Sequence, residues 1–383
     1  MNRFNVANAS YRPSAAARLP LARAWLYQPE REWSYSHHPH LAYFKGRFYA
    51  IWSNGRRDED APGQHVLLAT SSDFLEWSPP APLLDVQMGK HSELVLTAAG
   101  FHQHAGRLAA YIGCYEYRPQ ALEHGQRHPS DSGHQDTTLL ALVTTDGVHW
   151  DGPHDLHLPI VPNHGPQPTA SGRLIISGNI SFPYTDDPAG LSGWRMTGIY
   201  PPSMAAGIVD DSESFWQVQA AMGWPAGLCE GSFFQTGDGT LCMLLRSNVE
   251  RLWLTESLDD GATWSAPRQV EFSDNAAKFH FGRLPDGRFY YVGCPDPAPR
   301  WQRSPLVLSL ASGMGDENRI EFDQHYILAD TPYLRRVDGL HKGGEYGYPH
   351  TLLHAGALHI IVSRQKEAVE ALRFPLSALS SID

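Results

Sequence analysis

Short strand-like runs of apolar and aromatic residues recur along the chain, and six pairs of them are joined by a similar phrase. Each phrase begins with glycine, often followed by arginine, and then enters the next apolar run. A glycine between two such runs is typical of the tight turn of a β-hairpin. Hairpin repeats of roughly 40–70 residues predict an all-β fold, a six-bladed β-propeller with four-stranded antiparallel blades. The six glycines are Gly46, Gly106, Gly172, Gly239, Gly287 and Gly356.

These turns divide the chain into six expected blades and a leading segment. Residues 1–30 are rich in Ala, Arg and Pro, and we expect them to pack on the ring or to supply a strand that closes it. Residues 31–383 are expected to form one catalytic propeller. Helices should be scarce, and residues 118–136, polar and rich in His and Pro, should form a long loop over one face. The blades are expected at residues 34–84, 93–156, 159–219, 228–270, 277–328 and from 346 to the C-terminus.

Composition narrows the choice of partners. The 383 residues carry a net charge of −11 with no basic run, which argues against nucleic acid. The four cysteines lie far apart and show no metal-binding spacing, so neither a disulfide framework nor a metal or cofactor is predicted. No apolar stretch has the length of a signal peptide core or of a membrane span. We therefore expect a cytoplasmic protein that does not enter a membrane; its oligomeric state stays open.

Ionisable residues recur on the strand that precedes each glycine turn by about eight residues. The innermost strand of each blade lines the axis of a propeller, so these side chains should converge. A buried group of this kind is costly to desolvate without a ligand or partner charges. The sequence therefore predicts a site on the axis. Its expected members are His38, His91, His164, Glu230, Lys278, His280, Tyr348 and His350.

A second motif repeats near the outer edge of the blades. Residues 257–264 read S-x-D-x-G-x-T-W, and residues 144–150 and 71–77 are shorter versions. The aspartate accepts backbone N–H groups, the glycine supplies a positive φ, and the tryptophan fills the blade. These turns resemble the Asp-boxes (BNR repeats) of the sialidase superfamily, whose catalytic domain is a six-bladed propeller.

The resemblance implies roles for particular residues. The segments Leu228-Cys-Glu230 and Leu245-Arg246-Ser resemble the family's paired glutamate and arginine, and Arg303 resembles a second arginine that binds the substrate carboxylate. Gly347-Tyr348-Pro349 resembles the setting of the nucleophilic tyrosine. The acid/base aspartate would be Asp58 or Asp60. One motif departs from the family: Ser36-His37-His38-Pro39 stands where the first carboxylate-binding arginine is expected, and imidazole lacks a permanent charge and the guanidinium fork.

Three functions remain open at this point. The first is a sialidase-like glycoside hydrolase of an acidic, uronate- or sialate-like glycan, with Tyr348 as nucleophile, Glu230 as its base and Asp60 as the acid. The second is a polysaccharide lyase that removes a proton from a uronate with a His or Tyr while a cation holds the carboxylate; the many inner histidines favour it. The third is a glycan-binding propeller without activity. The residues expected to bind substrate are Arg246, Arg303, His91, Lys278, His280 and His350, with His38 and His164 among the catalytic candidates.

Overall fold

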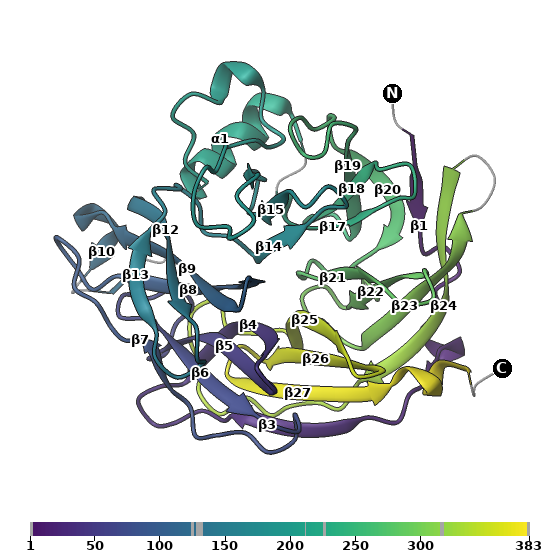
Figure 1. Ribbon diagram of the computed structural model, residues 1–383, viewed down its shortest axis with the longest axis horizontal. Coiled ribbons are helices and arrows are strands. Elements are labelled where there is room, and N and C mark those ends of the chain that lie inside the picture. Colours follow the sequence, from purple (N-terminus) through teal and green to yellow (C-terminus); the bar gives the residue numbers. More distant parts are fainter. Residues whose placement is uncertain are drawn as a thin grey trace.

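The strands form six antiparallel sheets set around one central axis (Figure 1). The computed structural model describes residues 3–123, 126–127, 133–210, 212–224, 227–314 and 318–380. Each sheet contacts the next all the way around, and the inner strand of the last blade meets that of the first. The prediction of an all-β, six-bladed propeller with four-stranded blades is therefore confirmed.

The first two blades are regular four-stranded sheets. Blade one contains β4 (Tyr35–Phe44), β5 (Arg47–Gly55), β6 (His65–Ser71) and β7 (Ala81–Leu84). Blade two contains β8 (Val95–His104), β9 (Arg107–Tyr117), β12 (His134–Thr144) and β13 (Asp151–Asp155). Between β9 and β12, the expected long loop includes a short ladder of β10 (Leu122–Glu123) and β11 (Gln126–Arg127); residues 124–125 and 128–132 lie outside the described part of the chain.

Blades three and four differ in regularity. Blade three has β14 (His164–Pro168), β15 (Leu174–Ser177) and β16 (Tyr184–Thr185), and its fourth position is reduced to isolated antiparallel bridges between residues 181–184 and 195–198. Blade four has β17 (Cys229–Gln235), β18 (Leu241–Arg246), β19 (Arg251–Ser257) and β20 (Arg268–Ser273). The expected extent of blade three is too long, because its last part forms a helix, α1 (Ser212–Met222), instead of a strand.

The leading segment completes the last two blades. Blade five has β21 (His280–Arg283), β22 (Phe289–Gly293), β23 (Leu306–Met314) and β24 (Arg319–Ala329), and β1 (Asn5–Ala7) and β2 (Ala17–Arg18) pair in parallel with β24. Blade six has β25 (Tyr346–His354), β26 (Ala357–Arg364) and β27 (Ala368–Pro375). Its fourth strand is β3 (Ala22–Tyr27), which pairs antiparallel with β27. The N-terminal part of the chain thus covers the edge of blade five and closes the ring at blade six.

The six predicted glycine turns all join the first and second strands of a blade. Each of the six glycines has a φ between +71° and +97°, a conformation that glycine adopts without the steric cost of a Cβ. Short 3₁₀ turns occur elsewhere, at Pro13–Ala15, Pro119–Ala121, Pro202–Met204 and Leu376–Ser380. The repeat recognised in the sequence is therefore the inner hairpin of each blade.

The hydrophobic core is divided among the six interfaces between blades. Leu244 of blade four packs with Phe281 and Phe322 of blade five, and Trp52 of blade one packs with Ile361 and Val369 of blade six. Corresponding clusters fill the other four interfaces. Burial of apolar side chains between neighbours holds the blades at fixed angles and so fixes where their inner strands end. Within the described ranges, no helix is long and apolar enough to cross a bilayer.

Candidate active site

A β-bulge interrupts equivalent places on the inner strands of blades one, four and six. The pairing slips by one residue between His37 and His40, between Cys229 and Ser232, and between Gly347 and His350. The residues inside these bulges are His38, Glu230 and Tyr348, with φ of 54°, 54° and 52°. A positive φ is strained for residues other than glycine, and bulges turn a side chain away from the regular pleat. Three strained residues from three blades are thus aimed at the same region.

Tyr348 and Glu230 meet there in direct contact. The Tyr348 hydroxyl donates a short hydrogen bond to Glu230 Oε1, and Arg246 Nη1 donates to Glu230 Oε2 at 2.5 Å and to the Tyr348 oxygen at 3.2 Å. Arg246 lies beside Glu230 because Cys229 and Arg246 are paired across β17 and β18. The structure thus brings these three residues together, and their roles stay predictions.

The charges of this trio are complementary. Burial raises the pKa of Glu230, but the Arg246 charge and the hydrogen bond from Tyr348 outweigh it, so the pKa lies below its ordinary value. Burial, reinforced by the Glu230 charge, raises the pKa of Tyr348 well above that of a free phenol. The pair therefore holds an ionised carboxylate against a protonated phenol, the starting state for a proton transfer from tyrosine to glutamate.

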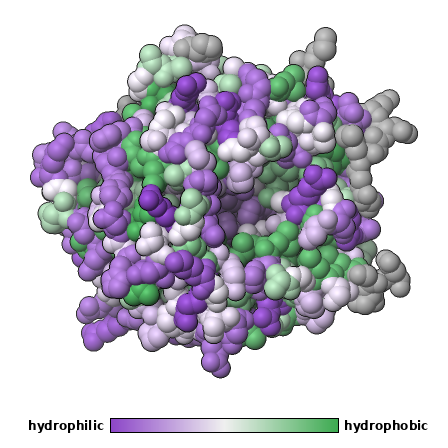
Figure 2. Space-filling view, in the orientation of Figure 1, coloured by the Kyte–Doolittle hydropathy of each residue, from purple (hydrophilic) through white to green (hydrophobic). Residues whose placement is uncertain are grey.

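These residues line a cavity of about 410 Å³. The face of the ring shown in Figure 2 is hollowed near its centre, where hydrophilic residues predominate. Blades one to six all contribute to the wall, and helix α1 adds Phe215 and Trp216. The cavity lining includes His38, Glu59, Asp60, Tyr115, Tyr117, Asp210, Trp216, Glu230, Arg246, Asn248, Trp301, Arg303, His341, Tyr348 and Lys366.

Arg303 supplies an incompletely bonded cation to this cavity. Its side chain is buried, and Nη2 makes one long contact, 3.4 Å, with the Ala276 carbonyl. Nε and Nη1 have no hydrogen-bond partner among the described residues. The guanidinium also lies over the Tyr348 ring, 5.8 Å from its centroid. Buried donors without partners are costly, so this group is suited to receive an acceptor from a ligand.

The loop after β5 places three neighbouring acids in different surroundings. Asp58 accepts a hydrogen bond from the Leu340 N–H at 2.7 Å and does not line the cavity, whereas Asp60 does. Between them, Glu59 is bound by both oxygens to the Lys366 ammonium, at 2.6 and 2.5 Å. Burial alone would raise the pKa of Glu59, but the charge of Lys366 and its hydrogen bonds outweigh burial. The pKa therefore lies below its ordinary value, and the carboxylate stays ionised. Of the two acids singled out in the sequence, the structure thus brings Asp60 to the cavity.

His38 stands in the cavity wall where the family resemblance leads one to expect an arginine. Its Nδ1 lies 3.1 Å from Ser53 Oγ, and its ring packs against Tyr348 with centroids 5.2 Å apart. Burial lowers the pKa of His38 to about 3, so the ring is neutral at ordinary pH. His38 therefore offers hydrogen bonding and shape, but no charge, to a ligand.

The other predicted residues do not reach the cavity. His91 is not at an inner position at all: it precedes β8 in a bend held by Glu116, and its side chain is exposed. His164, Lys278, His280 and His350 are close to the axis but absent from the cavity wall. Lys278 Nζ comes within 5.5 Å of the Tyr348 ring centroid. These four form a separate group beside the trio and not part of its lining.

Several lining residues were not predicted. Lys366 pairs with Glu59, and Glu367 pairs with Lys342 at 3.2 Å. Trp216 and Trp301, at 49% and 42% exposure, present indole surface at the cavity. Both tryptophans stand outside the strand repeat, on α1 and in the segment before β23, so no periodic signal marks them.

Among the residues that the structure describes, two groups of side chains have the composition of a metal site. Ligand atoms of His37, His38 and Glu59 lie within 4.8 Å of one another, as do those of His164, His280 and His350. The first group is already engaged, because Glu59 binds Lys366 and His37 Nδ1 lies 2.7 Å from Ser363 Oγ. The second group is considered below.

Most of the chain matches a known protein family. Residues 46–360 match the family model described as "BNR repeat-like domain". No curated protein matches the sequence. Solved structures do: a protein of unknown function from Dyadobacter fermentans is 14% identical with a TM-score of 0.63, and the match covers 93% of this chain and 100% of that one.

Two further solved structures with this fold are complexes of a sialidase and a trans-sialidase. Trypanosoma rangeli sialidase in complex with sialic acid is 14% identical with a TM-score of 0.62, covering 96% of this chain and 61% of that one. The intramolecular trans-sialidase of Ruminococcus gnavus with oseltamivir carboxylate is 13% identical with a TM-score of 0.61, covering 93% and 98%. At such identities the likeness concerns the fold. By the family match, its Asp-box turns and its six blades, the chain belongs to the BNR repeat-like domain family and has the sialidase-like propeller.

Proposed function

We propose that this protein hydrolyses a glycosidic bond in a glycan that carries a carboxylate, with Tyr348 as the nucleophile. The observation that carries the proposal is the buried hydrogen bond from the Tyr348 hydroxyl to Glu230, held in place by Arg246. Sialidases are the noted glycosidases that use a tyrosine in place of a carboxylate nucleophile. A neutral phenol activated by glutamate approaches an anionic sugar without the repulsion that a carboxylate would meet.

The proposed reaction has two steps. Tyr348 Oη bonds to the anomeric carbon and passes its proton to Glu230, while the bond to the leaving oxygen breaks and Asp60 gives that oxygen a proton. Water then displaces tyrosine from the anomeric carbon, Asp60 takes a proton from the water, and Glu230 returns its proton to the phenolate. Arg246, which contacts both Glu230 and Tyr348, stabilises the negative charge wherever it resides during these transfers.

The choice of an acidic substrate follows from a buried cation in the cavity whose hydrogen-bond donors lack partners among the described residues. Arg303 has two nitrogens without partners among the described residues, whereas the other cation of the wall, Lys366, is already paired with Glu59. A guanidinium binds a carboxylate through two parallel hydrogen bonds. The exposed faces of Trp216 and Trp301 fit the apolar faces of sugar rings. With neutral His38 in place of a further arginine, a uronate is as suitable as a sialate.

The alternative of β-elimination has lost its main support. It was favoured by the number of inner histidines, but His164, His280 and His350 are not in the cavity wall and His91 is exposed on the outside. Of the histidines that line the cavity, His38, His134 and His341, the one against Tyr348 is His38, and the direct contact of Tyr348 with Glu230 favours hydrolysis. We therefore propose hydrolysis alone.

The test uses fluorogenic sialosides, glucuronides and a neutral glucoside as substrates. We expect release from an acidic sugar and little from the neutral one. A fluorinated glycosyl fluoride of the active sugar should leave a covalent adduct on Tyr348, located by peptide mass spectrometry. Tyr348→Phe should lose most activity with an unchanged Tm, whereas Tyr43→Phe, which removes a hydroxyl far from the cavity, should keep both.

Three results would contradict the proposal. One is the appearance of the ultraviolet absorbance of an unsaturated uronate on acidic oligosaccharides, which would establish a lyase. Another is turnover by Tyr348→Phe close to that of the wild type. The third is tight binding of acidic glycans without turnover, which would make the cavity a binding site only.

A further inference from the structure

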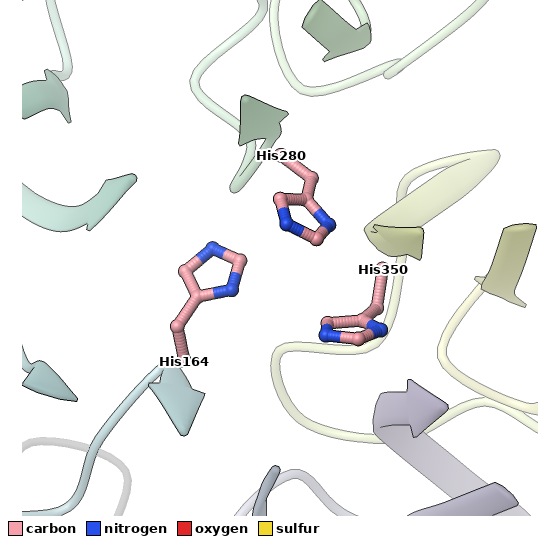
Figure 3. A group of neighbouring side chains, drawn as sticks. All are labelled: His164, His280 and His350. Carbon is pink, nitrogen blue, oxygen red and sulfur yellow. The ribbon is translucent and has the colours of Figure 1, made fainter. Parts of the chain in front are cut away.

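A second cluster of ionisable side chains lies on the propeller axis, next to the trio but outside the cavity wall. It consists of His40, His164, Lys278, His280 and His350, from blades one, three, five and six. In Figure 3 the rings of His164, His280 and His350 face a common space. Their centroids are 5.0 Å (164 to 280), 4.8 Å (280 to 350) and 6.2 Å (164 to 350) apart. The proposed reaction does not use this cluster.

Backbone contacts fix which ring nitrogens carry hydrogen. The N–H of Thr351 donates to His280 Nδ1 at 2.8 Å, and the N–H of Leu41 donates to His350 Nδ1 at 3.2 Å. Burial keeps the pKa of both rings far below its ordinary value, to about 3 for His280, so both rings are neutral. A neutral imidazole has one N–H and one lone pair. Since Nδ1 is the acceptor in both rings, Nε2 carries the hydrogen.

This tautomer argues against a metal ion. A metal ligand must offer a lone pair, and its other nitrogen normally donates to a carbonyl or carboxylate. Only His164 has this arrangement, because its Nε2 lies 3.2 Å from the Phe279 carbonyl and its Nδ1 has no partner in the described part of the chain. His280 and His350 would have to give up their backbone hydrogen bonds to become ligands. The cluster is therefore built to donate hydrogen bonds and not to coordinate a cation.

Lys278 adds an ammonium that forms no hydrogen bond with any described residue. The side chain is fully buried. Apart from burial, its charge is the largest influence on the pKa of His40, His164 and His280. The carboxylate that acts on it is Glu230, which already accepts hydrogen bonds from Arg246 and Tyr348. A buried charge without a counter-ion is strongly unfavourable.

Counting hydrogen-bonding groups shows what is missing. Lys278 brings three donors, and His40, His280 and His350 bring one N–H each. Both nitrogens of His40 and the Nδ1 of His164 lack partners within the described chain, so only two imidazole lone pairs are left to accept. Of the donors, the three Lys278 hydrogens and the His40 N–H have no partner within the described chain, about twice the number of free lone pairs. A ligand that completes the hydrogen bonds of this cluster must accept from several sides and carry negative charge.

We propose that the axial cluster binds a small monovalent anion of the halide class, held by the Lys278 ammonium and the N–H groups of His280, His350 and His40. A compact anion accepts from several directions at once, which suits donors that come from separate blades. It would leave the Lys278 ammonium charged next to the Tyr348 ring, 5.5 Å from its centroid. The site is independent of the proposed hydrolysis and would exist in a protein without activity.

The test compares thermal unfolding in sodium chloride and in sodium gluconate at equal ionic strength and about pH 6. Burial lowers the pKa of Lys278 to about 7, and the side chain is still protonated at pH 6 because this pH lies below that value. We expect Tm to rise with the logarithm of chloride concentration and not with gluconate. Lys278→Met should abolish the chloride dependence and, in gluconate, should melt at or above the wild type because the unpaired charge is gone. Lys90→Met removes an exposed lysine paired with Asp136 and serves as the control that keeps the dependence.

A second measurement does not depend on any variant folding. Crystals of the wild-type protein soaked in bromide should show an anomalous peak between Lys278 and the three histidine rings. Equal Tm values in the two salts together with no such peak would overturn the proposal. So would chloride dependence that survives in Lys278→Met, which would place the anion elsewhere. Stabilisation by zinc alone, unaffected by Lys278→Met, would overturn it in favour of a metal.

Discussion

At the scale of single residues, the site is defined by which polar groups are already satisfied. Arg246 Nη1 contacts both Glu230 and Tyr348, although its Nε has no partner among the described residues, whereas Arg303 hydrogen-bonds to neither and leaves both Nε and Nη1 free within the described chain. The two arginines therefore have different tasks, although both are buried in one cavity. We expect Arg246 to position Glu230 and Tyr348, and Arg303 to bind the carboxylate of the substrate.

This difference predicts the behaviour of Arg303→Lys. Lysine keeps the charge but loses the planar fork, so it cannot form two parallel bonds to a carboxylate. We expect KM for the acidic substrate to rise about tenfold, the equivalent of about 1.4 kcal/mol of binding, with a smaller change in kcat. Steady-state kinetics on the active fluorogenic substrate measure both. A loss confined to kcat would show that Arg303 acts on the reaction and not on binding.

Glu230→Gln isolates the proton acceptor. The amide has nearly the same shape and still contacts Arg246, but it cannot take the Tyr348 proton. We expect kcat to fall by about 10²–10⁴-fold, the usual contribution of a general base, with little change in Tm. Kinetics and a melting curve on the same preparation distinguish this from unfolding. Activity within a few-fold of the wild type would exclude Glu230 as the base.

At the scale of elements, the Asp-box turns fix the outer ends of three blades. In the turn between β19 and β20, the N–H of Thr263 donates to Asp259 Oδ1 at 2.8 Å, and the N–H of Gly261 donates to Ser257 Oγ at 2.8 Å. The turns of blades one and two repeat the pattern at Asp73 and Asp146. The turn of blade one holds Phe74 at φ 71°, where the other two have glycine at +83° and +84°.

Asp259→Ala should therefore affect stability and not activity. It removes the acceptor for the Thr263 N–H and its hydroxyl, and we expect the free energy of unfolding to fall by about 1–2 kcal/mol. Asp259→Asn keeps an acceptor oxygen and should cost less. Thermal melts of both, beside exposed Asp151→Ala as a control, give the comparison. An unchanged Tm for Asp259→Ala would show that the turn does not depend on the carboxylate.

At the scale of the whole molecule, the axis contains many imidazoles that are neutral because they are buried. Burial lowers the pKa of His37, His38, His40, His164, His280 and His350, to about 3 for His38 and His280. In the unfolded chain the same rings titrate near 6.5. Below that pH the unfolded state binds more protons than the folded one, so acid favours unfolding.

We therefore expect stability to fall between pH 6.5 and 5, by up to about 1.4 kcal/mol per pH unit for each such ring. Asp274 opposes this trend, because burial raises its pKa to about 7 and the folded state holds its proton longer than the unfolded state. Asp274→Asn removes that opposition and should make the fall steeper. Melting curves at the two pH values and constant salt decide the matter; a flat Tm would mean that the rings are already protonated in the folded protein.

The sequence predicted the fold, and placed Glu230 and Tyr348 near the axis, because both depend on the strand repeat. Arg246 was predicted from the resemblance to the sialidase family and not from the repeat. The repeat does not tell how far along the axis a residue sits: His350 follows Tyr348 by two residues, yet only Tyr348 lines the cavity. Lys366, Glu59 and Trp216 come from loops and from α1, where no periodicity constrains the chain, so they became visible only in three dimensions.

The pairing of β3 with β27 joins the beginning of the chain to its end within one sheet. Blade six cannot be completed during synthesis until β27 has emerged from the ribosome, long after β3. The same adjacency makes the molecule suitable for circular permutation. New ends could be opened in the exposed turn at Gly356 and the old ones linked, without altering the order of blades around the axis.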